Sequence, residues 1–130
     1  MAIYPTQEQL RTLLANPSNE PFVMVNLLRF KKQADAPDEG LTGQAAYSLY
    51  GEKMRGVVER HGGRLVWMGR VDSIVIEDGA QTYDAVALVE YPSRKAFVQI
   101  ATSAEVADIG VHRTAGLESQ WLLATTPGPG

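Results

Sequence analysis

The sequence contains no cysteine and only two histidines in 130 residues, and these shortages exclude several kinds of chemistry. Without cysteine there is no thiol nucleophile, no thiolate metal ligand and no disulfide scaffold. His61 and His112 lie far apart in the sequence, and neither HxxxH nor HxH spacing occurs. The P-loop, the GxSxG nucleophile motif and the GxGxxG dinucleotide motif are also absent. We therefore expect neither a metal nor a cofactor.

Positive charge and long hydrophobic runs are scarce as well. The 12 lysine and arginine residues against 15 aspartate and glutamate residues give a formal net charge of −3. This balance disfavours broad attraction to nucleic acid or to an anionic membrane. No window reaches the roughly 18 uninterrupted apolar residues of a membrane span, and the N-terminal residues lack the basic and apolar regions of a secretory signal. We expect a cytoplasmic protein with no nucleic-acid and no membrane partner.

The composition that remains is that of an ordinary globular protein, with 45% hydrophobic and 21% charged residues. A chain of this length buries about two-thirds of its unfolded surface when it folds, so it needs no covalent staple. We predict a single domain over residues 1–130, in which residues 1–20 form an N-terminal helical extension. Residues 126–130 (TPGPG) can neither continue a strand nor begin a helix, so we predict a flexible tail.

The hydrophobic pattern predicts a short leading helix followed by alternating strands and helices. Thr6 and Gln9 have the spacing of a capping box, and a stripe of leucines follows until Asn16-Pro17 ends the helix. The remaining predicted elements are a strand over 22–30, a surface loop over 31–43, a helix over 44–61, strands over 64–77 and 82–91, and a strand over 117–125. Between the last two strands, Ser93 and Ser103 are the predicted N-caps of two short helices, the second of which ends near residue 111.

This order of elements predicts an α+β fold. After the leading helix it is the ferredoxin-like split βαβ pattern, a four-stranded antiparallel sheet with helices on one face. The strands are nevertheless apolar on both sides, as at Val25 and Leu88. An exposed apolar sheet face would be a larger patch than a soluble monomer usually shows. We therefore predict a homodimer in which two copies pack sheet to sheet with two-fold symmetry.

Several segments carry a resemblance to a known family. The runs GGRLVWMGR, DAVALVEYPSRKAF and SAEVADIGVHRTAG resemble the domain-of-unknown-function 1330 family, a branch of the dimeric α+β barrel superfamily. The resemblance covers residues 26–123, and its best matching pieces are Gly62-Gly63-Arg64, Glu90-Tyr91-Pro92-Ser93-Arg94 and Arg113. It implies a barrel-shaped dimer. It implies no particular activity, because the superfamily includes cofactor-free monooxygenases, isomerases and haem enzymes.

The predicted topology gathers polar side chains at one end of the sheet. If Asp84 holds His112 there, the imidazole could act as a general base near neutral pH, so these two residues are the candidate catalytic pair. The candidate substrate-binding residues are Asn26, Arg29, Tyr47, Tyr50 and Arg113. The alternative is structural, because ion networks in small domains commonly serve stability. In that case Arg29, Asp84 and Arg113 pair at the rim and His112 is solvated.

Asn26 and Glu90 are polar residues inside apolar strands, and each has two interpretations. A buried amide needs partners for its donors and its acceptor, so Asn26 either binds a ligand or bonds a neighbouring loop. Glu90 is expected opposite residues 67–70, with Arg70 as a candidate partner, either as an ion-paired dimer contact or as a desolvated base. His61 is most simply explained by the end of its helix, whose last carbonyls it can bond.

Two functions from different classes remain open. The first is binding of a small aromatic or anionic metabolite in a pocket between sheet and helices, with or without cofactor-free oxygenase or isomerase chemistry. The second is a non-catalytic dimerisation or accessory module that has no ligand site. The sequence leaves open whether the protein is an enzyme.

Overall fold

The structure of the protein is a computed structural model that describes residues 2–79 and 81–128. Its elements are α1 (Gln7–Ala15), β1 (Phe22–Phe30), α2 (Gly43–Arg60), β2 (Arg64–Arg70), β3 (Ala85–Tyr91), α3 (Arg94–Ala101), α4 (Ala104–Gly116) and β4 (Leu117–Thr125). The strands form one antiparallel sheet in the order β2-β3-β1-β4. This is the predicted ferredoxin-like α+β fold, preceded by the extra helix α1. Of the predicted flexible tail, Pro129 and Gly130 lie outside the described residues.

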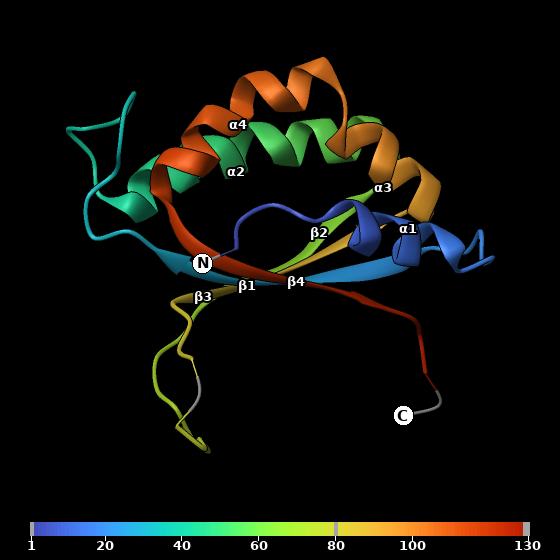
Figure 1. Cartoon of the computed structure of the whole chain (residues 1–130), viewed down its shortest axis with the longest axis horizontal. Coiled ribbons are helices and arrows are strands. Elements are labelled where there is room, and N and C mark those ends of the chain that lie inside the picture. Colours follow the sequence, from blue (N-terminus) through green and yellow to red (C-terminus); the bar gives the residue numbers. More distant parts are fainter. Residues whose placement is uncertain (1, 80, 129–130) are drawn as a thin grey trace.

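The helices cover only one face of the sheet. Helices α2 and α4 run side by side above the strands, and α3 lies on the same side with α1 packed against it (Figure 1). On the opposite side, the described chain places only the loop that follows β2 and the C-terminal tail (Figure 1). Alternation along β1 sends Phe22, Met24 and Leu28 into the core beneath the helices, and it sends Val25 and Leu27 to the bare face.

The bare face is apolar, as the sequence predicted. Besides the β1 residues, it carries Trp67 of β2 and Trp121 of β4, whose strand partners are Leu88 and Leu27. The two tryptophans are 61% and 54% exposed. Large aromatic side chains rarely remain this open in a soluble monomer.

The predicted helix starts are confirmed. Thr6 and Gln9 form the reciprocal capping box, with hydrogen bonds of 3.0 and 2.9 Å. Ser93 and Ser103 each accept the backbone N–H three residues on, at 3.0 and 3.3 Å. Helix α4 runs on to Gly116, beyond the predicted end near residue 111. It can do so because Gly116 fits closely against α2, where an added Cβ would lie 2.3 Å from the Gly43 carbonyl oxygen.

The long strand predicted over residues 64–77 is wrong beyond Arg70. Strand β2 ends there, and β3 begins at Ala85 rather than at residue 82. The alternating apolar residues in between form an arm that leaves the sheet on the side away from the helices (Figure 1). Val75 and Ile76 in this arm are 89% and 91% exposed. A strand needs a hydrogen-bonded neighbour, and beyond the pairing of Arg70 with Ala85 the ladder continues in the described chain only with the bond from Val71 N to the Asp84 carbonyl oxygen at 2.9 Å.

The register of β2 also changes the expected partner of Glu90. A bulge lies between Leu65 and Trp67, and Arg64 pairs with Glu90 across the ladder. The Arg64 Nε–Glu90 Oε1 distance is 3.1 Å, so the predicted partner Arg70 was wrong. A sequence count cannot locate the bulge or the true length of the hairpin loop.

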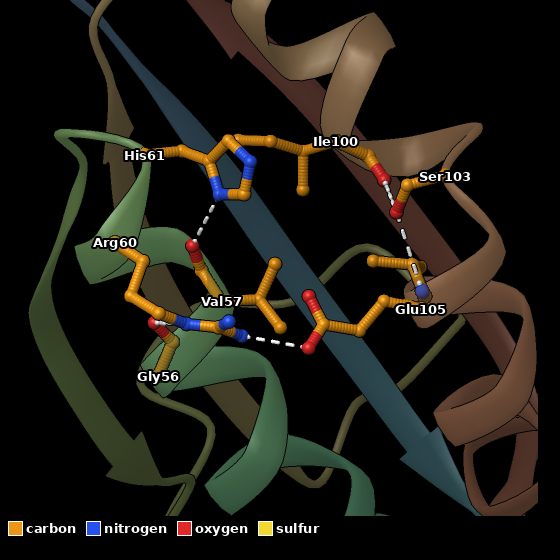
Figure 2. A network of polar contacts seen from close by, with 8 residues as sticks. Gly56, Val57, Arg60, His61, Ile100, Ser103 and Glu105 are labelled. Atoms are coloured by element: carbon orange, nitrogen blue, oxygen red, sulfur yellow. Dashed lines mark hydrogen bonds and ion pairs between the residues drawn. The ribbon is translucent and has the colours of Figure 1, made fainter.

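Near the start of α4, polar contacts tie α2 to α4 (Figure 2). Arg60 Nη2 of α2 lies 2.8 Å from Glu105 Oε2 in the first turn of α4. His61 Nδ1 donates to the Val57 carbonyl oxygen at 2.8 Å, which confirms its interpretation as a helix-end contact.

Candidate functional site

A cavity of about 660 Å³ lies between the covered face of the sheet and helices α2, α3 and α4. This volume is in the range of small-molecule pockets. Its wall is mostly apolar and aromatic, with contributions from Met54, Phe97, Val106 and Leu122. Its polar groups come from Tyr4, Asn26, Tyr47, Tyr50, Tyr91, Thr102, Arg113, Thr114 and Gln120. Among the described residues that line it, Arg113 is the only charged one, so the only formal charge on that part of the wall is positive.

Three tyrosines give the cavity neutral hydrogen-bond donors. The rings of Tyr47 and Tyr50 lie 5.4 Å apart, centroid to centroid. Burial raises the pKa of Tyr47, the nearby Tyr50 raises it further, and Arg113 opposes the change. Burial likewise raises the pKa of Tyr50 and of Tyr91. All three hydroxyls stay protonated at neutral pH, and within residues 2–79 and 81–128 none of them bonds another protein group.

A chain of hydrogen bonds connects Arg113 to the sheet. Arg113 Nη2 donates to Gln120 Oε1 at 2.6 Å, and Gln120 Nε2 donates to Asn26 Oδ1 at 2.8 Å. Asn26 Nδ2 then donates to the Ala87 carbonyl oxygen at 3.2 Å. Asn26 therefore bonds neighbouring strands rather than a loop, and its amide orients Gln120 and, through it, Arg113. Gln120 was missed at the sequence level, although it is a polar residue on the face of β4 that also faces the helices.

Four of the five candidate substrate-binding residues line the cavity: Asn26, Tyr47, Tyr50 and Arg113. Arg29 does not. It follows the fully buried Leu28 along β1, and alternation turns it to the bare face of the sheet.

The structure does not bring the candidate catalytic residues Asp84 and His112 together. Asp84 Oδ2 accepts the Phe30 N–H at 2.8 Å at the end of β1. His112 Nδ1 lies 2.7 Å from Asp38 Oδ2 in the loop after β1. This loop folds back onto α4, as the 3.0 Å bond from Asp35 N to the Ala115 carbonyl shows, so His112 finds its carboxylate there. Neither Asp84 nor His112 lines the cavity.

The alternative rim network is not formed either. In the described chain, the side chain of Arg113 bonds Gln120 and the Ile3 carbonyl oxygen rather than a carboxylate. Its guanidinium also lies over the Tyr4 ring, 5.2 Å from the centroid. The N-terminal segment thus contributes to the site, and no pattern in the sequence indicated this contact.

Other kinds of site are not seen in the described residues. No group of three or more histidine, aspartate or glutamate side chains in residues 2–79 and 81–128 is placed to hold a metal ion. No helix found there combines the length and apolarity needed to cross a membrane.

The similarity to known proteins extends over almost the whole chain. A search of curated proteins found no significant match. The crystal structure of a protein of unknown function from Rhodopseudomonas palustris matches with 35% identity over 98% of both chains and a TM-score of 0.88. The methylated form of that protein matches with 35% identity over 99% of this chain and 97% of that chain, with a TM-score of 0.88. The model of the domain-of-unknown-function 1330 family matches residues 39–126, and the chain belongs to that family.

Proposed function

We propose that the protein binds a small aromatic or anionic metabolite in the cavity between the sheet and the helices. The observation that supports this most strongly is that, among the described residues of a mostly apolar and aromatic wall, Arg113 is the single charged group. An apolar pocket with few convergent polar groups suits a small ligand. The phenols of Tyr47 and Tyr50 supply donors for a carbonyl, a hydroxyl or a phenolate oxygen.

The same groups favour binding over chemistry. Two phenols and a guanidinium could polarise a carbonyl and stabilise an enolate, the electrostatic part of a cofactor-free isomerase or oxygenase. Such a reaction also needs a base within hydrogen-bond reach of the proton that it removes. No carboxylate or imidazole is among the described residues that line the cavity. We therefore put binding first and turnover second.

The test is a ligand screen by thermal shift, followed by titration calorimetry on the hits. The panel contains phenols, aromatic and aliphatic carboxylates, and the matching uncharged amides. A ligand at 100 times its dissociation constant adds about 2.7 kcal/mol of stability, a shift that such a screen detects. Tyr50→Phe should weaken the hits, whereas the matched variant Tyr83→Phe, outside the cavity, should not. If no compound shifts the melting temperature, the accessory-module alternative gains and the binding proposal fails.

We also propose that the chain acts as a homodimer through the bare face of the sheet. Support comes from the exposed tryptophans Trp67 and Trp121 and from the absence of any described helix over that face. Val25→Asp or Leu88→Asp would bury a charge in this contact and should give monomers by light scattering. Ser48→Asp, at an exposed position of α2, is the matched control and should leave the assembly unchanged. A folded Val25→Asp dimer would contradict the sheet-to-sheet arrangement.

A further inference from the structure

Residues 2–5 lie against Arg113, and Tyr4 and Pro5 of this segment line one side of the cavity. The Ile3 carbonyl oxygen accepts from Arg113 Nη2, and the Tyr4 ring lies beneath the guanidinium. The Tyr4 hydroxyl contacts Thr114 Oγ1, and Gln120 N donates to the Ala2 carbonyl oxygen at 3.0 Å. Two of these four contacts are therefore made to the residue that gives the cavity its charge, and the Ile3 side chain also packs against the buried core.

These contacts leave Arg113 in an unusual electrostatic position. It is half-buried and meets only carbonyl-type oxygens, one from Ile3 and one from Gln120. Among the residues that the structure describes, it has no carboxylate partner. A guanidinium gains most from a planar, bidentate anion. The Ile3 carbonyl oxygen therefore occupies a position where a charged oxygen would bind Arg113 more strongly.

The Ile3 carbonyl oxygen and a ligand carboxylate cannot both be bound by Arg113 when the carboxylate is held in a fork. Both forked geometries of an arginine, end-on and side-on, use a hydrogen of Nη2. Both hydrogens of Arg113 Nη2 are already engaged, one by Ile3 and one by Gln120. A carboxylate can be held in a fork only after the Ile3 carbonyl has left. Gln120 need not move, because Asn26 holds it in place at 2.8 Å.

The segment also has space to move. A second cavity of about 440 Å³ lies beyond it, beside α1 and β4, and residues Ala2, Ile3, Tyr4 and Pro5 line that cavity. Tyr4 and Pro5 border both cavities. The loop after β1, which also reaches the main cavity, is fixed more firmly. Its backbone bonds α4 at Lys31 N–Gly116 O (2.8 Å) and at Asp35 N–Ala115 O (3.0 Å).

We propose that the ligand is a carboxylic acid with an apolar body, and that its carboxylate replaces the Ile3 carbonyl on Arg113 and releases residues 2–5. This inference rests on the proposed binding function and names the class of ligand and the segment, residues 2–5, that moves when it binds. The carboxylate lies in a fork on Arg113, and the apolar body lies among the aromatic and aliphatic side chains of the cavity. Hydroxyl or keto groups on that body meet Tyr47 and Tyr50.

The first experiment compares charged and uncharged probes of the same shape. Benzoate, phenylacetate and octanoate are titrated by calorimetry against their amides. Each acid should bind at least about tenfold more tightly than its amide, equivalent to about 1.4 kcal/mol. If the amides or the phenols of the earlier panel bind and the acids have no advantage, the carboxylate proposal fails while the binding function stands.

The second experiment follows the displacement of residues 2–5 during binding. The chain has no cysteine, so Ala2→Cys provides a single position for a spin label. Saturating benzoate should increase the mobility of this label. A label at Ser48→Cys, on the exposed side of α2, is the control and should not respond. Binding of benzoate without any change at residue 2 would overturn the displacement.

The third experiment needs no ligand at all. Val106→Cys places one thiol on the cavity wall, and its reaction rates with an anionic and a cationic methanethiosulfonate are compared with those of Ser48→Cys. Because Arg113 is the charge in the cavity, the ratio of anionic to cationic rate should be about tenfold higher at residue 106, or about 1.4 kcal/mol. An equal ratio at both positions would refute an anion subsite even if no compound of the panel binds.

Discussion

The crossing of α2 and α4 gives the sharpest test of the packing, because two glycines meet there. A Cβ built on Gly43 would lie 2.0 Å from the Lys31 carbonyl oxygen and 2.7 Å from the Gly116 carbonyl oxygen. Both neighbours are backbone atoms, so neither can rotate away. Overpacking of this kind costs typically about 1–3 kcal/mol. The gain in helix propensity from alanine, about 1 kcal/mol in a helix interior, is smaller for the first residue of a helix.

We therefore expect Gly43→Ala to lower the free energy of unfolding by about 2 kcal/mol. Gly56→Ala is the matched control in the same helix, since an added Cβ there meets nothing within 4 Å. It should raise the free energy of unfolding by up to about 1 kcal/mol. Urea denaturation followed by circular dichroism at one protein concentration measures both variants. If Gly43→Ala is as stable as the wild type, the close contact of the two helices is wrong.

Three further outcomes follow from the burial of individual side chains. Burial raises the pKa of Tyr47, Tyr50 and Tyr91 above 10.0, so the unfolded chain releases these protons first. The free energy of unfolding should therefore fall as the pH rises above 10.0. In the folded protein, phenolate absorbance should show that the three tyrosines ionise at a higher pH than in the unfolded chain. Leu28→Ala removes a side chain with 0% exposure and should cost about 2–5 kcal/mol in urea denaturation. His112→Ala breaks the contact with the loop after β1 and should cost about 1–2 kcal/mol, measured in the same way; an unchanged midpoint would contradict a role for that contact.

Strands were predicted correctly where another strand of the chain pairs with them along nearly their whole length. Strands β1 and β4 begin and end at the predicted residues, and both pair along nearly their whole length. The error at residues 71–77 has a physical cause. Val75 and Ile76 favour extended backbone, but this preference describes a residue on a pleated, half-buried surface. A sequence pattern does not reveal whether a partner strand is in reach, so the arm and a true strand look alike.

The site could be predicted in part, for a related reason. Topology places residues along a strand or a helix, and this was sufficient to bring Tyr47, Tyr50 and Arg113 to one end. Topology does not determine on which face of the strand or helix a side chain lies. Successive helix residues point about 100° apart, and His112 faces the loop after β1, where it meets Asp38, while Arg113 lines the cavity. Arg29 does not line the cavity for the same reason, because the alternation that buries Leu28 turns Arg29 to the other face of the sheet.

The partners of the site residues were harder to predict. Gln120 and Asn26 meet only because β4 and β1 are neighbours in a particular register, with Leu28 opposite Gln120 and Asn26 opposite Leu122. The Ile3 carbonyl is a backbone group, and its position depends on how the N-terminal segment crosses the sheet edge. Such contacts come from the tertiary arrangement, which local sequence patterns do not encode.

The two edges of the sheet bear on how far self-association can go. On β2, the bulge at Val66 interrupts the ladder, and the exposed Arg64 and Arg70 flank it with positive charge. On β4, the carbonyl of Ala2 takes up the Gln120 N–H. Bulges, charges and covering segments all oppose the addition of a foreign strand to an open edge. Further chains therefore cannot easily extend the sheet into a fibril at either edge.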